Sequence, residues 1–154
     1  MMYHAMNVAD YIISYSNDHN MPISNLKLQK LLYYIQAASL VETGNPAFSD
    51  KITAWRYGPV VESVYYAYRI HINNNIDHPI DLSQRAVQIQ EISTGDQLVF
   101  KKVINSYEDY DSFAMVRKTH SETPWREVSG RNGNEITIES IKEYYMNHRE
   151  KIYG

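Results

Sequence analysis

The stretch KTHSETPWRE, residues 118–127, gathers a histidine, hydroxyls, acids and a tryptophan into ten positions. His120, Ser121 and Glu122 are the residue types of a hydrolase, in which a histidine activates a serine and an acid orients the histidine. Such triads are assembled in space, however, and adjacent side chains on a helix diverge by about 100°. No G-x-S-x-G elbow presents a serine anywhere in the chain. The cluster therefore predicts a structural role, and we expect no catalytic residue.

The same stretch has the pattern of a corner between two helices. Thr123 suits a helix N-cap, and Pro124 suits the first helical position after it. Trp125 brings a large ring that needs at least partial burial. His120, in the last turn of the preceding helix, can bind the free carbonyls at that helix end.

Other chemistries have no visible equipment. The six histidines lack the spacing of a metal site, and the pair His71 and His78 sits in or beside a polar loop. No glycine-rich phosphate-binding motif is present. The acids Glu108, Asp109 and Asp111 are most simply a solvated helix junction. We predict no metal and no cofactor.

Composition predicts one globular domain spanning residues 1–154. Hydrophobic residues are 44% and charged residues 21%, which is ordinary for a folded chain. The net charge of −3 does not favour nucleic acid. The absence of cysteine fits a reducing compartment, and neither a long apolar span nor a signal peptide is visible. We expect a soluble cytoplasmic protein with no membrane partner.

Helical signals dominate the chain. Asn7 is an N-cap candidate for a first helix that reaches about Asp18, and Ser24 caps the next one. That second helix has apolar residues on most of its circumference, which predicts central burial, and Gly44 suits its end. Further helices are expected at residues 94–107, through Leu98, Val99, Val103 and Ile104, at 112–120 after Asp111, and from Thr137 through Ile141 and Tyr145 to Ile152.

A small β element is expected near residues 52–57. The alternation in KITAWRY predicts a strand with Trp55 and Tyr57 on one face and Arg56 on the other. Gly58 and Pro59 then turn the chain into a helix with the proline at its first position. GRNGN, residues 130–134, is a turn signal. The fold class is mainly α (α+β), a single helical domain of about six helices.

Fourteen tyrosines include the doublets 33–34, 65–66 and 144–145. One ring of each doublet can face the core while the other faces solvent. Alternatively, some rings form a partner surface, because interfaces favour tyrosine, tryptophan and arginine.

Three blocks together resemble the SocA/Panacea antitoxin domain, also described as GepA-like phage-associated proteins. They are NLKLQKLLYYIQAASLVETGNPAFSDKITAWRYGPVVESVY (25–65), KTHSETPW (118–125) and ITIESIKEYY (136–145). The resemblance runs in order through nearly the whole chain. It departs from the usual pattern before Thr119, where FAMVRK replaces an alternating leucine-rich segment.

The resemblance implies a non-catalytic antitoxin, of bacterial or prophage origin, that neutralises a cognate toxin by direct contact. Lys30 and Gln29 need no place in a core, so we expect them to link their helix to the tyrosine-glycine-proline turn. A shared pocket of Trp55, Tyr57, His120 and Trp125 is a further hypothesis. The partner-binding or fold-determining candidates are Lys27, Gln29, Lys30, Tyr33, Trp55, Arg56, Tyr57, Gly58, Pro59, His120, Pro124 and Trp125.

Three alternatives remain open. One, which the same resemblance implies, is an adapter that delivers its partner to a ClpXP-type protease. Another is a phage or host regulatory protein, including one that binds DNA. The last is an enzyme that acts through His120.

Overall fold

One helix occupies the centre of the molecule. The structure, a computed structural model, describes residues 2–129 and 134–154. Within them α2 (Asn25–Thr43) is buried on nearly every side and contacts α1, α4, α5, α7 and one strand. The Ser24 hydroxyl accepts the Lys27 backbone N–H at 3.2 Å, and Gly44 ends the helix in the left-handed conformation at φ 80°. Both caps, and the central burial, are as expected from the sequence.

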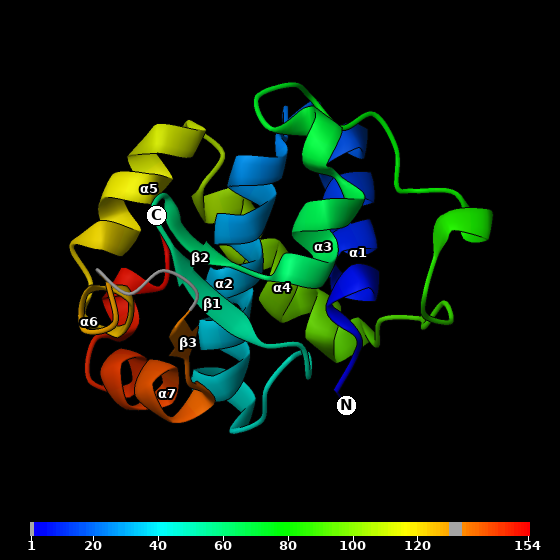
Figure 1. The fold of residues 1–154 in the computed structure, drawn as a ribbon. Helices are drawn as coiled ribbons and strands as arrows, with labels where there is room; N and C mark the ends of the chain where they lie inside the picture. Colours follow the sequence, from blue (N-terminus) through cyan, green and yellow to red (C-terminus); the bar gives the residue numbers. More distant parts are fainter. Residues whose placement is uncertain (1, 130–133) are drawn as a thin grey trace.

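The other helices surround α2 (Figure 1). On one side of it lie α1 and α3, α4 is behind it, and α5, α6 and α7 cover the opposite side. These seven α-helices of the described residues are one more than the sequence suggested, and three short 3-10 turns accompany them. The bounds are α1 Ala5–Asp18, α3 Glu62–Ala67, α4 Thr94–Ser106, α5 Ser112–His120, α6 Thr123–Arg126 and α7 Ile138–Met146, with 3-10 turns at Arg69–His71, Leu82–Gln84 and Arg149–Lys151.

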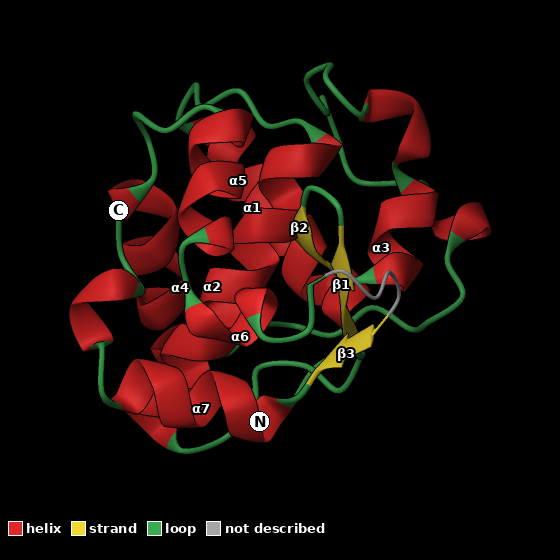
Figure 2. Cartoon of the chain, turned by 60° about the vertical axis from the view of Figure 1, so that its left-hand side comes forward, coloured by secondary structure: helices red, strands yellow, loops and turns green. Residues whose placement is uncertain are grey.

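Three short antiparallel strands form a sheet outside the helices (Figure 2). The strands are β1 (Ile52–Trp55), β2 (Gly58–Val60) and β3 (Asn134–Ile136), in the order β2-β1-β3. Trp55 pairs with Gly58, so the loop between β1 and β2 contains only Arg56 and Tyr57.

The hairpin corrects two predictions. Gly58 and Pro59 continue into a strand instead of starting a helix, because Gly58 at φ 106° turns the chain straight back along β1. Tyr57 lies in the loop, so the predicted alternation of Trp55, Arg56 and Tyr57 on one strand is wrong. The third strand, β3, has no counterpart in the sequence prediction, and most of the predicted GRNGN turn lies outside the described residues.

Several helix boundaries also differ from the prediction. Asn7 does not cap α1, which begins at Ala5, where the Asp50 carboxylate accepts the Ala5 backbone N–H at 2.9 Å. Asn7 is instead buried, and its side-chain amide donates to the Gln88 carbonyl oxygen at 3.0 Å. A distant residue has thus taken the capping role.

Near the C-terminus the chain bends more often than the apolar spacing suggested. Glu122, rather than Thr123, is the N-cap residue of α6, so Pro124 is the second helical residue. Helix α7 ends at Met146, and buried Ile152 follows a separate 3-10 turn. In α4, Leu98 is 65% exposed, whereas Phe100, two positions further along the helix, is buried in the core.

The tyrosine doublets behave in different ways. Tyr33 and Tyr34 are both fully buried, contrary to the expectation of one ring in and one ring out. In the other two doublets one ring is more exposed than the other: Tyr66 is 51% exposed beside a half-buried Tyr65, and Tyr145 is buried beside a half-buried Tyr144. Within the described ranges, no helix combines the length and apolar character needed to cross a membrane.

Gly58 is the position where the fold is least tolerant of a side chain. A Cβ there would stand 2.6 Å from Lys30 Cε and 2.8 Å from Thr119 Oγ1, on a backbone that L-residues rarely adopt. We predict that Gly58→Ala lowers the free energy of unfolding by about 2–4 kcal/mol in urea titration. The matched control is Gly95→Ala in α4, where a Cβ meets nothing within 4 Å and a gain of about 0.5 kcal/mol is expected. Equal effects of the two substitutions would contradict this account.

Candidate functional site

Polar side chains of α2 hold the β1–β2 hairpin in place. Lys30 Nζ donates to the Pro59 carbonyl oxygen at 3.1 Å, and Gln29 Oε1 accepts the Val61 backbone N–H at 2.8 Å. The Asn25 side-chain amide donates to the Tyr65 carbonyl oxygen at 3.0 Å. This bond connects α2 to α3 rather than to a strand. The bonds of Gln29 and Lys30 are the polar links that the sequence suggested, but both side chains lie buried in the core, contrary to the expectation that they need no place there. They fix the position of the hairpin loop relative to α3.

Lys30 is fully buried, and its only hydrogen bond within the described part of the chain is the one to Pro59. Burial disfavours the ammonium form and lowers the pKa of Lys30 to about 7. The Lys30 side chain therefore lies beneath the hairpin, with an apolar stem and a single polar group at its end.

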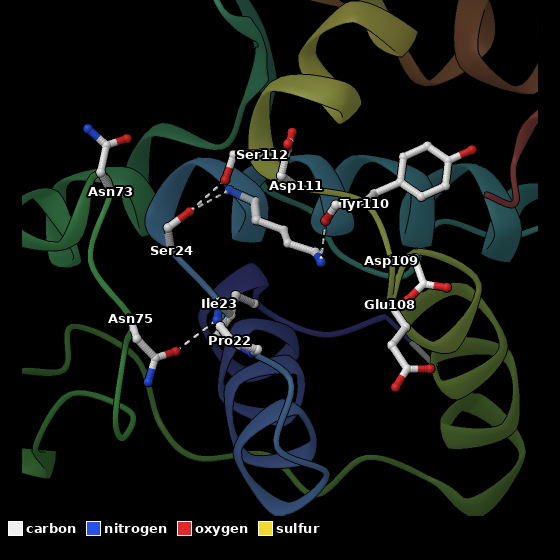
Figure 3. Close-up of a pocket in the computed structure, with 11 residues that line it drawn as sticks. Pro22, Ile23, Ser24, Asn73, Asn75, Glu108, Asp109, Tyr110, Asp111 and Ser112 are labelled. Atoms are coloured by element: carbon white, nitrogen blue, oxygen red, sulfur yellow. Dashed lines mark hydrogen bonds between the residues drawn. The ribbon is translucent and has the colours of Figure 1, made fainter.

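Lys27 lies at the junction between α4 and α5. Its ammonium donates to the carbonyl oxygens of Tyr107 at 3.0 Å and Tyr110 at 2.7 Å. Burial lowers the pKa of Lys27, while the charges of Asp111, Asp109 and Glu108 oppose that shift. The predicted acidic junction thus contains one lysine, whose positive charge offsets one of the three carboxylates. The junction borders a hollow of about 380 Å³ (Figure 3).

The opening cluster of residues 120–122 does not form a triad. The Ser121 hydroxyl donates to the Lys118 carbonyl oxygen at 2.7 Å, and the His120 ring stacks on Trp125 with centroids 3.9 Å apart. Burial lowers the pKa of His120, and a hydrogen bond with the Arg56 backbone opposes this. His120 thus contacts the hairpin loop rather than the carbonyls of its own helix end.

Glu122 is the centre of a buried polar network. Its carboxylate accepts the hydroxyl of Tyr34 at 2.7 Å and that of Tyr145 at 2.6 Å. Lys118 Nζ donates to it at 2.8 Å, and the Tyr145 and Tyr33 hydroxyls are 3.1 Å apart. Burial and the Glu122 charge raise the pKa of Tyr34 and Tyr145 well above the usual range. The network joins α2, α5, α6 and α7.

A groove of about 580 Å³ opens beside the hairpin loop, and we call it the aromatic groove. Trp55 meets Tyr65 edge to face at 4.8 Å, and Tyr57 meets Phe113 in the same way at 6.4 Å. Large exposed apolar patches mark interaction sites on soluble domains. The lining residues are Leu26, Trp55, Arg56, Tyr57, Val60, Tyr65, Tyr66, Ile72, Asn73 and Phe113.

The predicted four-residue pocket is divided between two places. Trp55 and Tyr57 line the aromatic groove, whereas His120 and Trp125 stack on each other outside its lining. Trp125 connects the two, because its indole N–H donates to the Trp55 carbonyl oxygen at 2.9 Å.

The remaining candidates lie beneath or beside the groove. Tyr33 and Pro124 are buried, and Gly58 and Pro59 form the buried strand β2. Sequence reasoning missed Tyr65, Tyr66 and Phe113 as groove residues. The Tyr65-Tyr66 doublet was the one available signal, while Phe113 gave none, since only the fold brings α5 to the hairpin.

The lining of the groove is mainly aromatic and apolar. Among residues 2–129 and 134–154, no three histidine, aspartate or glutamate side chains are grouped as metal ligands would be. The groove has aromatic walls, and its lining has Arg56 as the one cation.

A family model described as "Antitoxin SocA-like, Panacea domain" matches residues 28–126, which is more than half of the chain. The chain therefore belongs to the SocA-like, Panacea-domain antitoxin family. The matched range contains the hairpin, Lys30 and Glu122. It also contains all of the groove lining except Leu26.

A curated relative supports the assignment. Antitoxin SocA of Caulobacter vibrioides (strain NA1000 / CB15N) is 39% identical over 61 residues. The match covers 40% of this chain and 32% of the relative, so the chain matches about a third of that protein's length. No solved structure matches the chain.

Lys30 gives the stability of the chain a characteristic pH dependence. Its pKa is about 7 in the folded chain against 10.5 as the ordinary value, so the unfolded chain binds more protons between these two values. The free energy of unfolding therefore rises with pH in that window, by at most about 1.4 kcal/mol per pH unit, and this residue adds no dependence below the window. The raised pKa of the buried tyrosines reverses the trend once free tyrosine ionises near pH 10.

We predict that Lys30→Met flattens this slope in urea titrations at about pH 7.5 and pH 9. Lys51→Met, at an exposed position, is the matched control and should retain it. A slope that is the same in both variants would mean that Lys30 stays protonated in the fold.

Proposed function

We propose that the chain is an antitoxin that neutralises a cognate protein toxin by direct, non-catalytic binding. The observation that carries the proposal is membership of the antitoxin family through residues 28–126. The exposed aromatic groove supports it, because aromatic side chains with an arginine supply much of the energy in protein interfaces. The fixed hairpin supports it as well, since a surface that is already ordered loses less entropy on binding.

The direct test is neutralisation in cells. The chain is expressed together with the product of the neighbouring reading frame, and growth is compared with that of cells expressing the neighbour alone. We expect growth to be restored when the chain is present, and we expect the two purified proteins to elute together in size-exclusion chromatography. Continued growth arrest in the presence of folded chain would overturn the proposal for that pair.

A second experiment separates binding from catalysis through His120. His120→Phe retains a flat ring to stack on Trp125 but removes both ring nitrogens. If neutralisation is a matter of contact, this variant should restore growth as well as the unmodified chain does. Loss of neutralisation in a variant that keeps its thermal midpoint would instead point to imidazole chemistry.

A further inference from the structure

The exposed apolar residues of the chain are concentrated at one place. Ten large hydrophobic residues are exposed along the described chain, and four of these line the aromatic groove. They are Tyr57 (50% exposed), Tyr66 (51%), Ile72 (45%) and Phe113 (53%). The remaining six lie outside this lining. Covering the groove would therefore remove four of these exposed side chains from water together.

Arg56 gives one end of the groove a positive charge. It is the only arginine or lysine in the lining, which has no carboxylate. Its guanidinium stands over the Tyr57 ring, 5.5 Å from the centroid, and it makes no salt bridge with any described residue. A carboxylate from a binding partner can therefore approach it without displacing an internal one.

The hollow beside Lys27, which adjoins the groove, carries a negative charge. This acidic hollow shares Asn73 with the aromatic groove, and its lining has three carboxylates against the single cation of Lys27, a local net charge of −2. Figure 3 shows Glu108 and Asp109 on one side of the hollow, opposite Asn73 and Asn75. Their carboxylates form no hydrogen bond within the described chain, whereas Asp111 is occupied in capping α5.

The two hollows meet along two short segments. Leu26 and Phe113 line the aromatic groove, while their chain neighbours Lys27 and Ser112 line the acidic hollow. The surface therefore combines a cation, exposed aromatic rings and an adjoining anionic hollow. A partner with charges of both signs can match both charged parts of it.

We propose that this continuous surface is where the toxin docks, and that the toxin supplies one segment with three features. A carboxylate faces Arg56, a large apolar side chain enters the aromatic groove, and a lysine or arginine faces Glu108 and Asp109. This inference rests on the proposed function, since it names the contact face and the chemistry of the same partner.

Charge separates this occupant from nucleic acid. Aromatic rings with an arginine can also stack against bases. The acidic hollow would repel a phosphate backbone that continued past the groove, whereas it attracts a basic side chain. A protein segment with both charges satisfies both ends of the surface.

The test compares surface variants with matched controls in toxin binding measured by calorimetry. Phe113→Ala and Tyr66→Ala remove groove rings, and Leu98→Ala removes an exposed apolar residue elsewhere. Arg56→Glu and Asp109→Lys reverse the two ends, and Lys142→Glu and Glu143→Lys reverse exposed charges on α7. Unfolding midpoints confirm that each variant is folded.

We expect Phe113→Ala and Tyr66→Ala to raise Kd about tenfold or more. Arg56→Glu and Asp109→Lys should each raise it about tenfold and weaken its dependence on salt, while the three controls stay within about twofold.

Four results would overturn the inference. If the unmodified chain binds the toxin and the groove variants bind equally well, the proposed function stands and the docking face is elsewhere. If the groove variants change self-association in size-exclusion chromatography but not toxin binding, the occupant is a second copy of the chain. Competition for the groove by a single-stranded oligonucleotide would assign it to nucleic acid. If the unmodified chain does not bind the toxin, the proposed function fails and this inference fails with it.

Discussion

The burial of Lys30 against the Pro59 carbonyl is the contact on which the position of the hairpin and of the groove beside it depends. An amine inside a protein is costly unless it is hydrogen-bonded or neutral, and here one carbonyl and a lowered pKa meet that requirement. The contact is possible only because position 58 has no Cβ to obstruct the lysine stem. Lys30 and Gly58 therefore constrain each other: neither can change alone without moving the hairpin away from α2.

A second buried polar group organises the other half of the molecule. Glu122 receives hydroxyl donors from α2 and α7 and an ammonium from α5, so a single carboxylate connects the central helix to the C-terminal helices. Buried charges are tolerated when their hydrogen bonds are complete. The acid that looked like part of a hydrolase is thus a structural centre, and Trp125 next to it reaches the hairpin through the Trp55 carbonyl.

The sequence was informative where the signals are local. Ser24 and Gly44 marked the ends of α2 correctly because capping depends on a few neighbouring residues. The link from Gln29 and Lys30 to the hairpin was also predicted, although from the expectation that they lie outside the core; both are buried, and their polar groups find partners there. The resemblance to the SocA/Panacea domain that this segment carries agrees with the family model that matches residues 28–126.

Features that depend on contacts distant in sequence were missed. Strand β3 exists because residues 134–136 pair with β1, some eighty positions earlier in the chain. Asn7 looked like a cap, but Asp50 reaches the same helix end from a loop. The aromatic groove combines residues from α2, the hairpin, α3 and α5, and no spacing rule predicts that Phe113 lies near Tyr57.

In the hairpin of β1 and β2, the two loop residues are not the ones that hold the hairpin against α2. The chain that follows the loop is held from inside, by Lys30 at the Pro59 carbonyl oxygen and by Gln29 at the Val61 backbone N–H, while Arg56 and Tyr57 are exposed. Substitutions at these two positions leave the interior contacts untouched. Under the proposed function, a lineage can therefore change what the loop recognises in single mutational steps while the scaffold stays folded. The evolution of specificity and the maintenance of the scaffold would then be carried by different residues.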